Sequence, residues 1–115
     1  MNKRQTGTVF EKIAVNELKK QGYEIIETNF RCHIGEIDII GRDNGYLVFI
    51  EVKYRKNKAY GYPEEAVNYK KINTIKMIAM NYLKYKNISF DTPVRFDVLA
   101  IEGESVRLIK NAFNY

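Results

Sequence analysis

The chain has 115 residues, enough for one domain spanning 1–115 with a single hydrophobic core, and its 45% hydrophobic content without low-complexity tracts excludes an intrinsically disordered chain. The net charge of +5 favours polyanionic partners, such as nucleic acid or a membrane surface. The single cysteine, Cys32, excludes an internal disulfide, and no apolar run reaches membrane-spanning length or resembles a signal peptide. We therefore expect a cytoplasmic protein that does not enter the membrane.

Hydrophobic periodicity predicts two helices and five strands, in the order α-β-β-β-α-β-β. The expected helices cover about residues 8–21 and 63–85, and the expected strands about residues 24–30, 36–42, 46–54, 94–101 and 106–112. Gly22 is placed to end the first helix in a left-handed conformation, and Pro63 suits the first turn of the second. No repeat or domain linker interrupts this order, so the sequence predicts an α/β fold.

The central feature is a hairpin between the second and third strands. Asn44-Gly45 is typical of a two-residue turn, and such a turn makes facing residues carry numbers that sum to 89. Asp38 then lies opposite Glu51, and Glu36 lies opposite Lys53. Like charges placed directly opposite each other are destabilising, so a cation is expected between the two acids. A three-residue loop without a bulge would instead put Asp38 and Glu51 on different faces.

Both faces of this hairpin carry apolar residues, so we expect helices on both sides of the sheet. One face should hold Ile37, Ile39, Val48, Ile50 and Val52. The other should hold Ile40, Leu47 and Phe49 near the turn. Asp38 and Glu51 lie at the far end of this second face, where burial of ionised carboxylates without partners is unfavourable. The pattern therefore favours a divalent metal ion between them, with Lys53 alongside.

Such a site suits phosphodiester hydrolysis. Mg2+ prefers oxygen ligands and commonly takes one or two protein carboxylates together with substrate phosphate oxygens, which Asp38 and Glu51 would allow. Lys53 would orient the attacking water or offset the developing charge, and Glu36 could hold the Lys53 ammonium in place. The alternative is a strand with solubilising charges or a structural ion pair, because the bare D…ExK pattern is common.

Glu11 has two readings. With Thr8 it forms a capping box, in which Glu11 only satisfies a backbone donor at the helix start. If the helix begins earlier, Glu11 shares a sheet-facing flank with Ala14 and Leu18, and it could reach the metal directly or through water.

At these residues the sequence resembles known nucleases. Asp38, then Glu51-Val52-Lys53 in the paired strand, after a helix that carries Glu11, looks like the PD-(D/E)XK core of restriction endonucleases and archaeal Holliday junction resolvases, although Ile37 replaces the usual motif proline. Nearly the whole chain resembles the YraN-like family of small bacterial predicted nucleases. The segments that carry this resemblance are 29–31, 35–40, 48–55, 61–67, 95–98 and 111–113.

The resemblance implies a restriction endonuclease-like, three-layer domain with a central mixed sheet of about five strands flanked by helices. It implies a Mg2+- or Mn2+-dependent endonuclease that acts on DNA, with branched or junction DNA as the preferred substrate class. The main-chain carbonyl of Val52 would complete the metal shell beside Asp38 and Glu51. Resolvases of this size work as symmetric dimers, which suggests a homodimer.

Candidate nucleic-acid contacts follow Lys53 directly. The loop 54–62 interleaves cations with aromatic residues, a composition that suits phosphate contacts and base stacking, although ordinary solvated loop charge looks the same. The residues proposed for binding are Arg55, Lys56, Lys58 and Tyr60, with Arg31 and Lys71 flanking the same cleft.

Other polar residues point to structure. Asp97 is more typical of a buried partner for a basic side chain than of a metal ligand, and Cys32 with His33 supplies too few ligands for structural zinc. The alternative functions are a non-catalytic nucleic-acid-binding protein on a nuclease-like fold, and a scaffolding protein with little affinity for nucleic acid.

Overall fold

The computed structural model describes residues 3–55 and 69–113, with residues 3–8 described by their backbone alone. The elements are α1 (Lys3–Lys20), β1 (Glu24–Cys32), β2 (Gly35–Asp43), β3 (Tyr46–Arg55), α2 (Tyr69–Tyr85), β4 (Val94–Glu102) and β5 (Ser105–Phe113). The predicted order α-β-β-β-α-β-β is confirmed. The first helix begins at Lys3 rather than Thr8, and the predicted start of the second at Pro63 lies outside the described residues.

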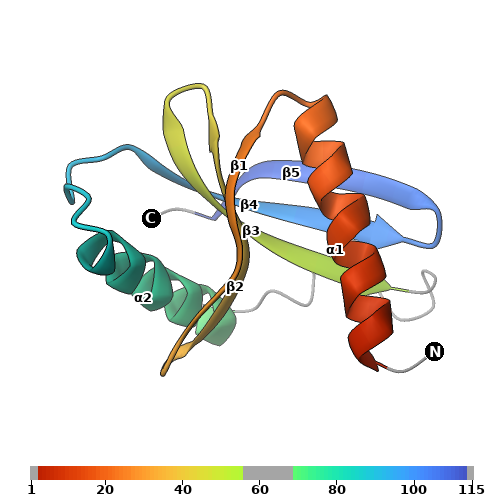
Figure 1. Cartoon of the computed structure of the whole chain (residues 1–115), viewed down its shortest axis with the longest axis horizontal. Coiled ribbons are helices and arrows are strands. Elements are labelled where there is room, and N and C mark those ends of the chain that lie inside the picture. The colour runs from red at the N-terminus through yellow and green to blue at the C-terminus, as the bar shows by residue number, and fades with distance from the viewer. Residues whose placement is uncertain (1–2, 56–68, 114–115) are drawn as a thin grey trace.

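The five strands form one mixed sheet in the order β1-β2-β3-β4-β5 (Figure 1). Strands β3 and β4 are parallel because the chain between them crosses over through α2, and the other three neighbouring pairs are antiparallel. Alternate residues of β3 pack into different cores: Phe49 lies in the cluster beneath α2, whereas Val48 and Ile50 lie in the cluster beneath α1. The helices therefore cover opposite faces, which confirms a three-layer α/β fold.

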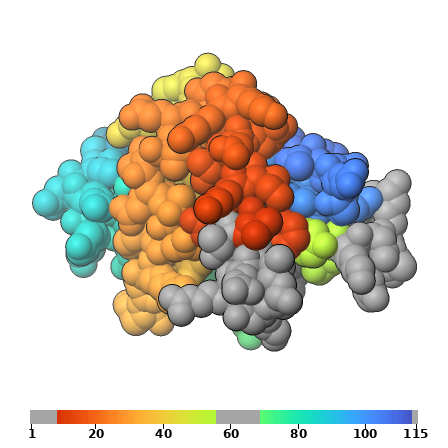
Figure 2. All heavy atoms as spheres, turned by 45° about the vertical axis from the view of Figure 1, so that its right-hand side comes forward, coloured from red at the N-terminus to blue at the C-terminus, as the bar shows by residue number. Residues whose placement is uncertain are grey.

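The surface next to α1 is formed by elements from both ends of the sheet. In the space-filling view, α1 lies between the β1–β2 hairpin and the β4–β5 end (Figure 2). Neither α1 nor α2 combines the length and hydropathy of a membrane-spanning helix, a finding that covers the described residues only.

Both helices end at residues that tolerate a positive φ. Gly22, with φ of 93°, follows α1, and the N–H of Tyr23 donates to the carbonyl of Leu18 at 3.0 Å. Asn87, with φ of 56°, follows α2, and the N–H of Ile88 donates to the carbonyl of Leu83 at 2.8 Å. These bonds satisfy carbonyls that each last turn leaves unpaired, as the sequence predicted at Gly22.

The β2–β3 hairpin has the predicted register. Asn44 and Gly45 both have positive φ, 52° and 83°, as a primed two-residue turn requires. Asp43 faces Tyr46, and the pairing continues to Ile39 opposite Ile50. Beyond this pair β2 turns away with β1, while β3 continues beside β4 (Figure 1). We call the point where β2 and β3 separate the fork.

Regular alternation breaks at the fork. Ile37 packs beneath α2 and Ile39 packs beneath α1, so the prediction that they share a face is wrong for Ile37. Asn29 of β1, with φ of 55°, lies between the residues that pair with Ile37 and Ile39, and is therefore level with Asp38. The β1–β2 ribbon thus changes orientation at the predicted catalytic aspartate, because its partner strand is irregular there.

Candidate active site

Asp38 is fixed to the neighbouring strand by a backbone hydrogen bond. Its Oδ2 accepts a bond of 2.8 Å from the N–H of Val52 in β3. In an uninterrupted ladder Val52 would face Ile37, but the strands have separated there. A partly buried N–H needs an acceptor, and the carboxylate of Asp38 supplies it. The fork therefore holds this side chain in the gap between the two strands.

The carboxyl groups of Asp38 and Glu51 act on each other. The pKa of Asp38 rises from 3.8 to about 7: burial is the largest cause, the charge of Glu51 and a side-chain hydrogen bond with it act in the same direction, and the bond from Val52 opposes the shift. Glu51 itself is only 8% exposed. The predicted closeness of the two acids is thus present, and the protein keeps a proton on Asp38 at a pH where an exposed aspartate is fully ionised.

Two lysines neutralise Glu51. The Nζ of Lys53, from the same strand, lies 3.5 Å from Oε1 of Glu51, and the Nζ of Lys71, from the first turn of α2, lies 4.0 Å from the same oxygen. The Lys53 side chain is 20% exposed and that of Lys71 is 41% exposed. The sequence placed Lys53 beside the acids, and the packing of α2 adds Lys71 to the same cluster.

Glu36 does not hold the Lys53 ammonium, contrary to the prediction. Its Oε2 accepts a hydrogen bond of 2.6 Å from Nε of Arg31, which lies directly opposite it in β1. Pairing of Glu36 with Lys53 required the β2–β3 ladder to continue, and the fork ends that ladder before Glu36. Glu36 still contributes, because its charge is a further cause of the raised pKa of Asp38.

Glu11 is hydrogen-bonded to Asn29 and is not grouped with Asp38 and Glu51. The capping box is wrong because α1 begins before Thr8, and Glu11 shares its helix flank with the buried Ala14, as the alternative predicted. Its Oε2, however, accepts a hydrogen bond of 2.7 Å from Nδ2 of Asn29. Across residues 3–55 and 69–113, no three His, Cys, Asp or Glu side chains come close enough to hold one metal ion.

A pair of carboxylates is nevertheless sufficient for Mg2+ or Mn2+. These ions take oxygen ligands and complete their shell with water and substrate oxygens, so a third acidic side chain is not required. Burial and the charge of Glu51 raise the pKa of Asp38, so full ionisation of both carboxylates at this site is favoured by an additional cation. A divalent cation would supply that positive charge, so the residues fit the ion that the sequence predicts.

The predicted nucleic-acid contacts are only partly described. Lys71 lies at the site, whereas Arg31 is 77% exposed and paired with Glu36. Arg55 Nη1 donates to the carbonyl of Tyr54 at 3.2 Å, and the Tyr54 ring stacks on that of Phe10. The remaining candidates, Lys56, Lys58 and Tyr60, lie outside the described residues.

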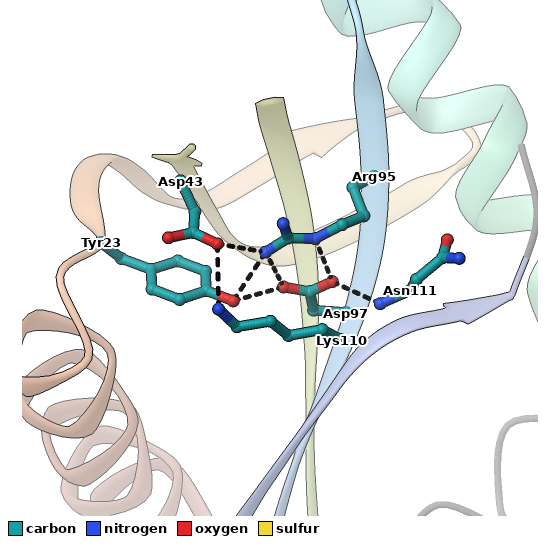
Figure 3. A network of polar contacts seen from close by, with 6 residues as sticks. All are labelled: Tyr23, Asp43, Arg95, Asp97, Lys110 and Asn111. Carbon is teal, nitrogen blue, oxygen red and sulfur yellow. Dashed lines mark hydrogen bonds and ion pairs between the residues drawn. The ribbon is translucent and has the colours of Figure 1, made fainter. Parts of the chain in front are cut away.

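Asp97 belongs to a separate polar network, as the sequence favoured (Figure 3). It is fully buried, and Arg95 donates to its two carboxylate oxygens at 2.9 and 2.8 Å. The hydroxyl of Tyr23 donates to Asp97 Oδ2 at 2.6 Å, and Arg95 also reaches Asp43 at 2.7 Å. Because Tyr23 packs in the cluster beneath α1, this network lies on the opposite face from the Lys71 ammonium. The buried position of Asp97 and its bond to Arg95 are those of a structural partner, as the sequence favoured.

Sequence reasoning missed Asn29 and the Tyr23 hydroxyl. An asparagine inside a strand is a weak sign of a left-handed residue, and it is the only local signal for the bond between Asn29 and Glu11. Tyr23 has no such signal, because its partner Asp97 is 74 positions away.

Comparison with known proteins places this chain in a family. The model of the uncharacterised protein family UPF0102 matches residues 10–101. A UPF0102 protein of Lachnoclostridium phytofermentans is 50% identical over 114 residues, covering 99% of this chain and 97% of the relative. Similar proteins of Acetivibrio thermocellus and Caldicellulosiruptor bescii are 48% and 44% identical, covering 97% and 98% of this chain and 93% and 100% of those relatives.

Proposed function

The chain belongs to the uncharacterised protein family UPF0102, and from its paired carboxylates we propose that it is a divalent-metal-dependent phosphodiester hydrolase acting on DNA. The observation that carries this proposal is the cluster at the fork. Asp38, held by the Val52 N–H, shares a partly buried space with Glu51, and the Lys53 ammonium lies 3.5 Å from Glu51. The resemblance to the PD-(D/E)XK nucleases assigns the same three side chains to hydrolysis.

Asp38 and Glu51 would hold Mg2+ or Mn2+, together with the main-chain carbonyl of Val52. When bound, the ion supplies Lewis-acid activation of water and neutralises charge on the phosphate. Lys53 is mostly buried beside Glu51, so its ammonium is confined where it can orient water and stabilise negative charge in the transition state. Lys71, which is more exposed and comes from α2, supplies positive charge to the substrate phosphate.

DNA is the proposed substrate because the chain is basic and two lysines lie beside Glu51 at the candidate site. The cationic and aromatic residues of segment 54–62 would add phosphate and base contacts. The resemblance to junction-resolving nucleases leads us to propose branched DNA as the substrate class and a homodimer as the active form. The composition leads us to propose a cytoplasmic location.

The proposal is tested by a cleavage screen. Labelled duplex, single-stranded, flap and four-way DNA are incubated with the protein, with and without Mn2+. We expect metal-dependent cleavage of at least one substrate, with loss of at least a hundredfold in Asp38→Ala, Glu51→Ala and Lys53→Met. Glu104→Ala, which removes an exposed acid from the β4–β5 turn, is the matched control and should retain wild-type activity.

One observation favours the alternative of a non-catalytic nucleic-acid-binding protein. Glu51 is already paired with Lys53 and Lys71, which is also what a structural ion pair requires. This alternative predicts salt-dependent DNA binding without cleavage under any metal condition, and binding that survives Asp38→Ala. Cleavage that depends on Asp38 and Glu51 would exclude it.

A further inference from the structure

A groove of about 800 Å3 lies between β1 and the C-terminal half of α2. Neither Asp38 nor Glu51 lines this groove, so it is separate from the candidate active site. The residues of interest in its wall are Phe30 and Arg31 from β1, Lys84 and Tyr85 from α2, Lys86 directly after the helix, and the one acid Glu27.

Positive charge predominates in the groove. Arg31 is 77% exposed, Lys84 is exposed, and Lys86 is 41% exposed. Glu27 is the one carboxylate of the wall and lies 3.7 Å from Nζ of Lys86, so it offsets only one of the three cations. Arg31 pairs with Glu36, which lies outside the wall, and its guanidinium still has donors available for an anion. The groove is therefore complementary to a polyanion.

Exposed aromatic surface accompanies these cations. Tyr85 is 73% exposed as a residue, and its ring centroid lies 6.4 Å from that of the partly buried Phe30. Nζ of Lys86 lies 5.3 Å from the centroid of the Tyr85 ring. An aromatic face beside ammonium groups can stack on an unpaired base while the cations contact the flanking phosphates. Paired bases in a duplex do not present their faces in this way.

The groove and the candidate active site lie along the same helix. Lys71 contacts Glu51 near the start of α2, and Lys84 lies thirteen positions later, which corresponds to about 20 Å along the helix axis. Arg31 of the groove wall pairs with Glu36, which precedes Asp38 by two residues in β2. A nucleic-acid strand covering about 20 Å comprises roughly six nucleotides at about 3.4 Å each.

We propose that this groove binds a single-stranded nucleic-acid segment that extends from the phosphodiester held at Asp38 and Glu51. The inference rests on the proposed function, and it specifies the substrate as one with an unpaired strand of about six nucleotides or more beside the scissile bond. The cations hold the backbone, and Tyr85 stacks on a base without reading its identity.

The test measures binding in EDTA, where cleavage cannot occur. Fluorescence anisotropy compares a blunt duplex with duplexes that carry single-stranded tails of 3, 6 and 12 nucleotides, in DNA and in RNA. We expect affinity to rise with tail length up to about six nucleotides. Lys84→Ala/Lys86→Ala should lose at least tenfold of the tail-dependent affinity, and Tyr85→Ala should lose about fivefold or more, whereas Tyr85→Phe keeps the stacking ring and the affinity.

Matched controls separate the groove from general charge. Lys19→Ala/Lys20→Ala removes the same two charges from exposed positions at the end of α1, and it should reduce tailed and blunt binding equally. All substituted side chains are exposed, and circular dichroism confirms that each variant is folded. If Lys84→Ala/Lys86→Ala behaves like this control, or if tails add no affinity to the wild type, the groove does not bind nucleic acid.

The two proposals can fail independently. If the wild type cleaves DNA with Mn2+ but the groove variants keep their tail-dependent affinity, the inference fails and the hydrolase stands. If no substrate is cleaved while the groove variants lose tail-dependent affinity, the hydrolase fails and the binding groove stands. A preference for DNA or RNA tails identifies which polynucleotide the groove takes.

Discussion

The backbone N–H of Val52 donates a hydrogen bond of 2.8 Å to the carboxylate of Asp38, so an acidic side chain occupies the position where the β2–β3 ladder stops. This bond lets the strands separate without leaving a backbone donor unpaired. It also brings Asp38 to Glu51, where burial and like charge raise its pKa to about 7. Ionisation of both carboxylates at the fork is therefore unfavourable, and a bound cation would make it favourable.

The first prediction concerns pH and the stability of the metal-free protein. The pKa of Asp38 is 3.8 in its ordinary state and about 7 in the folded protein. The contribution of protonated Asp38 to the free energy of unfolding is therefore complete below pH 3.8 and is lost as the pH rises through 7. Asp38→Asn stays neutral and can keep the bond from Val52. We expect the variant to gain on the order of 3 kcal/mol over wild type between pH 4.5 and 7.5.

Urea unfolding in EDTA at these two pH values measures this difference. Taking the difference between variant and wild type removes the contribution of the other titrating groups. A difference that does not change with pH would show that Asp38 has an ordinary pKa.

The second prediction concerns uptake of the metal ion. Binding of Mn2+ to the Asp38–Glu51 pair must release the proton of Asp38, so the apparent affinity should fall about tenfold for each pH unit below 7 and level off above it. Titration calorimetry at pH 6, 7 and 8 measures this dependence. Glu51→Gln should abolish Mn2+ binding, and Glu104→Ala should leave Mn2+ binding and its pH dependence intact. Uptake that is equal at all three values would argue against ligation by Asp38.

The third prediction separates the two roles considered for Glu11. Glu11→Gln keeps an oxygen that can accept the hydrogen bond from Asn29, so cleavage and Mn2+ affinity should stay within about twofold of wild type. Glu11→Ala loses that bond and should reduce the free energy of unfolding by about 1 kcal/mol. Calorimetry and urea unfolding on the same samples measure both. A tenfold loss of Mn2+ affinity in Glu11→Gln would restore the direct ligand role.

The fourth prediction concerns the buried network in Figure 3. Arg95→Met leaves the fully buried Asp97 without its cation and should lower the free energy of unfolding by about 3–5 kcal/mol. Burial and the bond to Asp97 raise the pKa of Tyr23, so its hydroxyl stays protonated, and Tyr23→Phe should remove only about 1–2 kcal/mol.

Thermal and urea unfolding measure both variants, and cleavage per folded molecule should be unchanged in Tyr23→Phe, because the network lies on the other face of the sheet from Lys71. A large loss of specific activity in folded Tyr23→Phe would show that the network acts on the site.

The sequence by itself determined the order of elements, the hairpin register and the pairing of the acids. Each follows from short-range physics. Asn44-Gly45 is the residue pair that a primed turn requires, and that turn sets the register as far as Ile39 opposite Ile50. Helical periodicity indicated the buried face of α2, and Gly22 marked the end of α1. Lys53 follows Glu51 by two positions, so it is near that carboxylate once the strand exists.

Only the tertiary structure decided where β2 leaves β3. The residues before Ile39 pair with β1, whose shift in register near Ile25 and left-handed Asn29 cannot be read from hairpin geometry. Because this part of β2 pairs with β1, Glu36 contacts Arg31 and Ile37 packs on the face beneath α2. The physical reason is that strand partners compete for the same backbone hydrogen bonds. The outcome depends on contacts between segments far apart in the chain, which no local pattern records.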